Sequence, residues 1–349
     1  MSNNIEQLVG QLIIAGFRDS ELSNNSAIEQ YIKGYNLAGV ILYDEDVKIG
    51  GPGTRNVKSP TQLKTLIDDL QSFSSNQNLL ISVDQEGGTV HRLKSIYGFP
   101  EAPAWQHIGL LKDKLITKQF SETLSEALYS VGVNVNFAPV LDLDYGDKTV
   151  IGKTQRAFTS DPDLLIKHAK IFIDSHKKRH IISCGKHFPG QGSAFGDTHE
   201  GYTDISNSWT VKDLLPFDKL IQDNYLDLIM VSHTFDTKLD PTYPASLSKK
   251  IITYTLRDDL GFQGVVICDD PSMRAISDNY NLRDTFEIML NAGIDLFCLG
   301  NNLIYDPDYI PRSVNAICEL LTSGKIKKER ILESLERIKT LKKKYKIRV

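Results

Sequence analysis

Eight short apolar runs, separated by stretches with helical periodicity, are the feature that most constrains how this chain folds. Each run is apolar at nearly every residue, which is typical of strands in a parallel sheet covered on both faces. Segments 59–73 and 119–132 show the helical pattern in the gaps, and the runs span residues 12–17, 38–43, 79–84, 133–143, 180–187, 226–233, 264–270 and 293–301. Eight strand-then-helix units predict an α/β fold, a single (β/α)8 TIM-like barrel, and the structural alternative is a doubly wound open sheet.

The length of the chain fits this architecture. A barrel of this kind takes roughly 250 residues, and the chain has 349, which leaves room for long loops and terminal helices. The last segment, 324–346, has Ile331, Leu335 and Ile338 near helical spacing with basic residues between them. We therefore expect a final amphipathic helix rather than a nucleic-acid-binding tail, and one barrel domain over residues 1–349.

Charge and composition exclude several classes of partner. The formal net charge is -4 and the isoelectric point is near 6.1, which gives no basic surface for a nucleic acid or an anionic membrane. The first residues lack the features of a signal peptide, and the sequence has no run of about 18 apolar residues. We expect a cytoplasmic protein, a monomer or weak oligomer, with a small or neutral substrate.

The four cysteines show no CxxC pairing and are predicted to be buried, reduced thiols. They are Cys184, Cys268, Cys298 and Cys318.

Polar residues gather at the carboxyl ends of the apolar runs. Barrel enzymes assemble their active sites at that end of the barrel, from successive strand-to-helix loops. Any one such residue also fits a helix cap or a satisfied polar group, but together they favour catalysis. The residues are Asp84, Asp142, Lys186, His187, His233, Asp269, Asp270 and Asn301. By its position in "MVSH", His233 is predicted to line the pocket.

The segment "GKHFPGQGSAFGDTHEG", residues 185–201, follows the fifth predicted strand and is rich in glycine. Its glycines allow a long loop to fold over the pocket. In an extended segment, Asp197 and His199 share one face, so that the carboxylate can orient the imidazole for proton transfer. A metal site at His187, Asp197 and His199 is the competing chemistry, but the spacing matches no zinc signature and Lys186 is a repelling charge. We predict no metal and no cofactor.

The run 264–270 ends in two adjacent carboxylates, Asp269 and Asp270. Successive residues of a strand point to opposite sides, so only one of them faces the barrel mouth. Asp270 precedes Pro271 and is also a candidate cap for a following helix. The residues alone leave open which of the two is functional.

Several segments resemble the β-N-acetylglucosaminidases of glycoside hydrolase family 3. The stretch "KHFPGQGSAFGDTHE" is similar to the family signature K-H-F-P-G-(H)-G-x4-D-(S/T)-H. Further segments that resemble the family are "ISVDQEGGTVHRL", "NFAPVLDLD", "PASLS" and "GFQGVVICDDPSM". Together these segments follow the family's order between residues 10 and 345, and the resemblance implies a (β/α)8 barrel with the whole site on one domain.

The resemblance also implies roles for individual residues. It makes Asp269 the nucleophile that forms a glycosyl-enzyme intermediate, His199 the general acid/base, and Asp197 the partner of that histidine. The implied contacts to the terminal sugar are Asp84, Arg92, Arg156, Lys186 and His187. The implied activity is that of a retaining exo-β-N-acetylglucosaminidase, which we expect to act on GlcNAc-containing fragments of the bacterial cell wall.

The sequence departs from the family pattern at four places. Gln191 stands where the family usually has His, Pro271 replaces Leu, and two additional residues precede Arg156. An acidic, glycine-rich insertion covers residues 44–54 and is expected to reshape the pocket and the accepted substrate length. The alternative functions are those of a β-glucosidase, a glycoside phosphorylase and a non-catalytic sugar-binding barrel. Trp105 is either a packing residue or a platform on which a sugar stacks.

Overall fold

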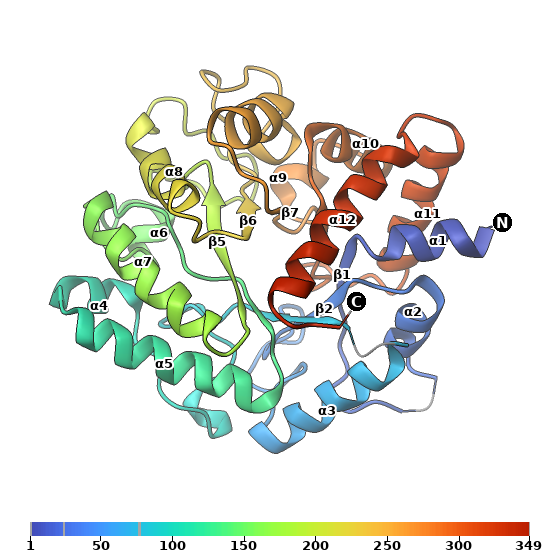
Figure 1. Ribbon diagram of the computed structural model, residues 1–349, viewed down its shortest axis with the longest axis horizontal. Coiled ribbons are helices and arrows are strands. Elements are labelled where there is room, and N and C mark those ends of the chain that lie inside the picture. The colour runs from blue at the N-terminus through green and yellow to red at the C-terminus, as the bar shows by residue number, and fades with distance from the viewer. Residues whose placement is uncertain (1, 24, 76–77, 349) are drawn as a thin grey trace.

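The computed structural model describes residues 2–23, 25–75 and 78–348 and shows a closed barrel of eight parallel strands (Figure 1). The barrel closes where β1 pairs with β8, with Ile14 opposite Cys298. This closure confirms the predicted barrel and shows that the open-sheet alternative is wrong. The strands are β1 Ile13–Gly16, β2 Gly39–Leu42, β3 Leu80–Val83, β4 Val135–Asn136, β5 Ile182–Phe188, β6 Leu228–Val231, β7 Val265–Cys268 and β8 Leu296–Leu299.

Helices surround the strands, as Figure 1 shows. Many begin at side-chain caps that the sequence supplies, such as Ser59 before α3 and Asp161 before α7, each followed by a proline in the first turn. The helices are α1 Ser2–Gly10, α2 Ala27–Tyr35, α3 Pro60–Phe73, α4 Trp105–Leu111, α5 Lys114–Val131, α6 Val150–Lys153, α7 Pro162–Lys177, α8 Leu215–Gln222, α9 Arg274–Ser277, α10 Leu282–Ala292, α11 Tyr309–Thr322 and α12 Lys328–Lys344. Four further helical segments are η1 Ser95–Tyr97, η2 Val211–Leu214, η3 Ala245–Leu247 and the π-helical η4 Lys250–Asp259.

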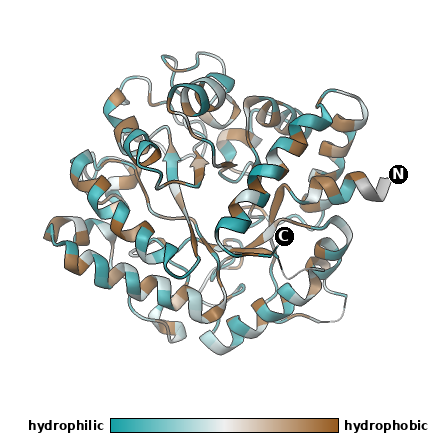
Figure 2. Cartoon of the chain, viewed as in Figure 1, coloured by the Kyte–Doolittle hydropathy of each residue, from teal (hydrophilic) through white to brown (hydrophobic). Residues whose placement is uncertain are grey.

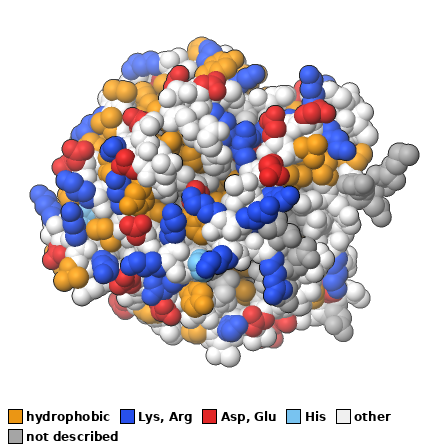
Figure 3. Space-filling model, in the orientation of Figure 1, with side chains coloured by type: hydrophobic (Ala, Val, Ile, Leu, Met, Phe, Trp, Pro, Cys, Tyr) orange, Lys and Arg blue, Asp and Glu red, His pale blue; other side chains and the backbone are white. Residues whose placement is uncertain are grey.

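The core lies in and around the barrel. All residues of the eight strands are buried, and Figure 2 shows hydrophobic strands at the centre, with helices that are hydrophobic on one side and hydrophilic on the other. On the face shown in Figure 3, Lys and Arg side chains are mixed with Asp and Glu. Within the described residues, no helix combines the length and the apolar character that a membrane crossing requires.

The fourth strand is shorter than its apolar run predicts. The run covers 133–143, but only Val135 and Asn136 form β4. Pro139 has no backbone N–H to donate to a neighbouring strand, but the chain stays hydrogen-bonded to β5: the carbonyls of Ala138 and Pro139 accept N–H groups of β5, and Val140 forms a bridge with Lys186. The chain beyond β4 therefore continues along β5 with irregular pairing and brings Asp142 beside the end of β5.

The structure answers the open question of Trp105 and tests the predicted burial of the cysteines. Trp105 is fully buried, and its ring contacts Phe120, Phe158 and Phe172, so it is a packing residue and not a sugar platform. The three strand cysteines are free and buried, as predicted, but Cys318 on α11 is free and only partly buried, so the predicted burial is wrong for this residue.

Helix α12 confirms the predicted C-terminal helix and contains a buried lysine. Lys342 is 7% exposed, and its ammonium donates a long hydrogen bond of 3.4 Å to the carbonyl of Ala38. Burial lowers the pKa of Lys342 to about 8. Because this value lies below that of an unfolded lysine, the charged form opposes folding.

We predict that Lys342→Met raises the free energy of unfolding at pH 7 by about 2 kcal/mol, since it removes a poorly partnered buried charge. The penalty of the lysine is fully present below pH 8 and disappears as the pH rises towards about 10.5, the usual lysine pKa. Thermal unfolding at pH 7 and pH 10 measures the gain, which should shrink at the higher pH. Lys339→Met, at an exposed position of the same helix, is the control. A lower melting temperature for Lys342→Met at pH 7 would contradict this account.

Candidate active site

A cavity of about 560 Å³ opens at the carboxyl ends of the strands. Most of the residues that the sequence singled out for chemistry lie on its wall. Those residues are Asp84, Arg92, Arg156, Lys186, His187, Asp197, His199 and Asp269. The structure therefore brings together side chains that are up to 185 positions apart in the chain.

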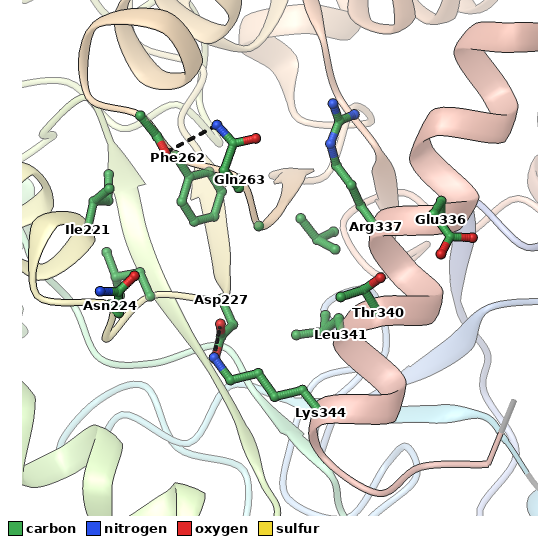
Figure 4. Close-up of a pocket in the computed structure, with 14 residues that line it drawn as sticks. Ile221, Asn224, Asp227, Phe262, Gln263, Glu336, Arg337, Thr340, Leu341 and Lys344 are labelled. Carbon is green, nitrogen blue, oxygen red and sulfur yellow. Dashed lines mark hydrogen bonds and ion pairs between the residues drawn. The ribbon is translucent and has the colours of Figure 1, made fainter.

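A second cavity, of about 350 Å³, lies at the opposite end of the barrel, between α12 and the chain that leads into β6 and β7 (Figure 4). Lys344 extends from α12 to Asp227 and pairs with it at 2.6 Å. The other basic residue of this cavity, Arg337, pairs with Asp295 at 3.1 Å. The wall of this second cavity contains none of the residues that the sequence singled out. The first cavity is therefore the candidate active site.

A buried carboxylate, Glu86, organises one side of the candidate site. Arg156 donates two hydrogen bonds of 2.8 Å to it, and Lys186 pairs with it at 2.6 Å. Burial would raise the pKa of Glu86, but the two cations lower it to about 2. Lys186 also pairs with Asp84 at 2.8 Å. Both cations are thus held in fixed positions with their charges balanced.

Asp142 holds His187 in a similar way. Its carboxylate lies 2.6 Å from Nδ1 of His187 and accepts backbone N–H bonds from His187 and Gln191. The other ring nitrogen of His187, Nε2, lies 3.3 Å from the guanidinium of Arg156. The carboxylate therefore fixes the orientation of the ring on the cavity wall.

Arg92 adds a further charged side chain to the cavity wall, on the side of β2. Its guanidinium lies 3.8 Å from Asp84 and 3.8 Å from Asp44, both longer than a hydrogen bond, and it also stands over the ring of Tyr43. Asp44 is buried and pairs with Lys94 at 2.5 Å. Arg92 is partly exposed and keeps donors available to a ligand in the cavity.

The two adjacent carboxylates at the end of β7 have different environments. Asp269 is half-buried on the cavity wall; burial would raise its pKa, but the neighbouring His233, His187 and His199 lower it. Asp270 is buried and accepts N–H bonds from Ser272 and Gly300. Burial raises the pKa of Asp270 to about 6.

Asp270 does not cap a helix that starts at Pro271, because α9 begins only at Arg274. It closes a turn over Ser272 and ties β7 to β8. A Cβ at Gly300 would collide with the Tyr43 hydroxyl and the Asp270 carboxylate, so the close approach of these groups requires glycine there.

Asp197 and His199 form a pair at the mouth of the cavity. Nδ1 of His199 lies 2.7 Å from Oδ1 of Asp197, which also accepts the backbone N–H of His199. The segment is a turn rather than the extended chain that we expected, and both side chains are partly exposed. The backbone N–H bond in the turn brings the two groups together, and Nε2 of His199 remains available to a substrate.

The pKa values of this pair move in opposite directions. The hydrogen bond from His199 lowers the pKa of Asp197 to about 2. Burial would lower the pKa of His199, but the Asp197 hydrogen bond and the charge of Asp269 raise it. The raised pKa of His199 favours the protonated form that a general acid requires.

His233 does not lie on the cavity wall, contrary to the prediction. It is buried, with Nδ1 2.7 Å from the Ser246 hydroxyl and Nε2 3.0 Å from the carbonyl oxygen of Asp270. Both ring nitrogens are occupied, and burial lowers the pKa of His233. Its position supports the backbone beside Asp269, and not a ligand.

The metal alternative groups His187, Asp197 and His199. In the structure, His187 pairs with Asp142 beside the cationic Arg156, while Asp197 and His199 pair with each other. Across residues 2–23, 25–75 and 78–348, no three His, Cys, Asp or Glu side chains are grouped to hold a metal ion.

Sequence reasoning assigned no role to two buried carboxylates of the site. Glu86 stands in the segment "VDQEGG", two positions after Asp84. This spacing is the sequence feature that points to Glu86 as a residue of the site. For Asp142, the sequence indicates only a polar residue at a strand end. Its link to His187 crosses from one strand end to the next, which no local pattern reveals.

The fold and the cavity together define a (β/α)8 barrel with a polar, enzyme-like site at the carboxyl ends of its strands. The family described as "Glycosyl hydrolase family 3 N terminal domain" matches residues 4–341. The chain belongs to glycosyl hydrolase family 3.

Curated relatives include a "Beta-hexosaminidase" from Nitrosomonas eutropha, 34% identical over 82% of this chain and 77% of the relative. Another "Beta-hexosaminidase", from Hydrogenovibrio crunogenus, is 36% identical over 76% of this chain and 72% of the relative. A solved family 3 β-N-acetylglucosaminidase from Paenibacillus sp. superposes with a TM-score of 0.88 at 28% identity. That alignment covers 98% of this chain but only 62% of the longer Paenibacillus protein.

We predict that Asp197→Asn lowers the pKa of His199, because the substitution removes the negative charge that stabilises the imidazolium. An NMR titration of the histidine ring protons measures this pKa. Asp278→Asn, which removes an exposed carboxylate paired with Arg274, is the control and leaves the His199 pKa at its wild-type value. An unchanged His199 pKa in Asp197→Asn would show that the pair does not form in solution.

Proposed function

We propose that this protein is a retaining exo-β-N-acetylglucosaminidase that releases terminal β-linked GlcNAc, with residues 1–349 acting as one catalytic domain. The observation that carries the proposal is the placement of Asp269 and the Asp197–His199 pair on one cavity. The names of the curated relatives and of the Paenibacillus structure support the choice of sugar.

In the first step, the carboxylate of Asp269 attacks the anomeric carbon, and His199 donates the proton on Nε2 to the glycosidic oxygen. The bond from the sugar to the leaving group breaks, and a glycosyl-enzyme ester forms on Asp269. In the second step, His199 takes a proton from water, which attacks the same carbon and releases Asp269. Two displacements retain the β configuration.

The electrostatics of the site suit these roles. The histidines around Asp269 keep it anionic, as a nucleophile must be, and the raised pKa of His199 supplies the proton for the first step. Asp197 keeps Nδ1 of His199 occupied, so that Nε2 faces the substrate. His233 acts as a positioning residue through its bond to the Asp270 carbonyl.

The other predicted residues form a polar wall for the sugar. Lys186, Arg156 and Arg92 supply donors, Asp84 supplies acceptors, and His187 stands between them. Charged donors and acceptors held in this way bind sugar hydroxyls and an acetamido group with strong hydrogen bonds. We place the natural substrates among peptidoglycan-derived fragments in the cytoplasm, a part of the proposal that rests on the sequence alone.

The proposal predicts that the wild-type protein hydrolyses an aryl β-GlcNAc much faster than the matching aryl β-glucoside, with GlcNAc and not its 1-phosphate as product when phosphate is present. Asp269→Ala should reduce turnover by at least about 10³-fold without loss of the fold, because no ester can form. Asp270→Asn should lower turnover far less. Product analysis and steady-state kinetics measure both. If Asp270 proved essential for turnover and Asp269 dispensable, Asp270 would be the nucleophile instead of Asp269.

The role of His199 predicts a dependence on the leaving group. His199→Ala should lower kcat/KM strongly for glycosides of weakly acidic phenols, which need protonation, and little for acidic phenols, which leave as anions. Asp197→Asn should show the same trend more weakly, since the imidazole remains. Kinetics over a series of phenols test this. A penalty that is equal for all leaving groups would show that His199 is not the acid.

A further inference from the structure

We propose that His176, on the outer helix α7, is a positioning residue of the candidate active site, because it fixes the loop that follows β3. That loop covers residues 84–94. It carries Asp84 and Arg92, which line the cavity, and Glu86, which pairs with the two other cations of the polar wall. The expected effect on turnover rests on the proposed glycosidase function, whereas the contacts themselves do not depend on the substrate.

The state of the His176 ring follows from its surroundings. The side chain is fully buried, and its ring stacks on that of Phe172 with the centroids 4.0 Å apart. Nδ1 lies 2.9 Å from the carbonyl oxygen of Phe172. A carbonyl oxygen only accepts, so Nδ1 carries the proton. Burial lowers the pKa of His176 to about 4 and keeps the ring neutral. Nε2 is therefore a hydrogen-bond acceptor.

The acceptor at Nε2 holds the side chain of Asn136 at the end of β4. The amide nitrogen of Asn136 lies 3.1 Å from Nε2 of His176 and also donates to the carbonyl of Gln85 at 3.1 Å. The amide oxygen accepts the backbone N–H of Gln85 at 3.0 Å. Without His176, one buried N–H of Asn136 has no partner, which is unfavourable. The side chain then regains a partner only by leaving Gln85.

Gln85 connects this contact to the far end of the loop. Its side-chain oxygen accepts the backbone N–H groups of Arg92 at 2.9 Å and of Leu93 at 3.0 Å. Between these points, the N–H of Glu86 donates to the carbonyl of Val90 at 2.9 Å. The chain from His176 to Gln85 therefore holds both ends of the loop, and with them the charged side chains that face the cavity.

A second buried histidine of α7 has no such connection. His168 is as buried as His176, but Nδ1 of His168 bonds the hydroxyl of Thr117 in α5. Its other ring nitrogen has no hydrogen-bond partner among the residues that the structure describes. The two histidines share a helix, a residue type and full burial, and only one of them contacts the network behind the polar wall. His168 is therefore the matched control.

The first test is amide hydrogen exchange on the full chain, which needs no substrate. His176→Leu removes the acceptor and keeps an apolar side chain of similar size. In this variant, the backbone N–H groups of Gln85, Arg92 and Leu93 should exchange at least about tenfold faster than in the wild type. His176→Gln offers a side-chain oxygen in place of Nε2 and should restore much of the protection. His168→Leu should leave exchange in the loop unchanged.

The same variants are compared in steady-state kinetics with an aryl β-GlcNAc. The polar wall contacts the sugar in the ground state and in the transition state, so its displacement weakens both. We expect KM to rise about five- to tenfold in His176→Leu with little change in kcat. His176→Gln and His168→Leu should stay near the wild-type KM. A general loss of stability would instead lower the active fraction in both leucine variants and leave KM unchanged.

A measurement on the wild-type protein tests the origin of the network even if a variant does not fold. The nitrogen chemical shifts of the His176 ring at pH 7 should show the neutral tautomer with the proton on Nδ1. A proton on Nε2 would overturn the inference. So would unchanged loop protection in His176→Leu, an equal loss in His168→Leu, or a loss that His176→Gln shares in full. Absence of turnover with every β-GlcNAc substrate would overturn only the proposed function.

Discussion

The pairing of one buried carboxylate with two cations is the interaction on which the site depends. Glu86 lies between Arg156 and Lys186, and a buried charge is tolerated only when it is paired and hydrogen-bonded. Without Glu86, the two cations would repel each other and move apart. With it, their remaining hydrogen-bond donors point into the cavity in fixed directions. The polar wall is thus formed before a ligand arrives, and binding to it needs little rearrangement.

The barrel divides the remaining tasks among its strands. The polar wall lies at the ends of β3, β4 and β5, the proposed nucleophile Asp269 follows β7, and the proposed proton donor His199 lies on a loop that runs from β5 to the helix after β7. Because the proton donor lies on a turn and not on a strand, its contacts with Asp197 and with α9 replace the support that the sheet gives to the other residues. The long glycine-rich segment after β5 is what allows this crossing.

The sequence predicted the barrel because eight buried strands produce eight uniformly apolar runs, and it singled out, at strand ends and in the family's motifs, residues that the structure brings onto one cavity wall. It failed where the outcome depends on contacts between distant segments. The burial of His233 depends on Ser246 and on the backbone of Asp270, and the role of Asp142 depends on its position beside β5. The turn at Asp197 was missed because a spacing of two fits both a strand and a turn.

The way in which the inserted loop is anchored has a consequence for how such an enzyme can diverge. Asp46 anchors the insertion mainly through Arg18 and the loop's own backbone, whereas only Asp44, at the start of the loop, lies within 4 Å of the charged group of a polar-wall residue, Arg92. Substitutions in the rest of the loop can accumulate without disturbing the ion pairs around Glu86 or the carboxylate at the end of β7. The loop beyond Asp44 is therefore open to natural variation that leaves the charged side of the cavity unchanged.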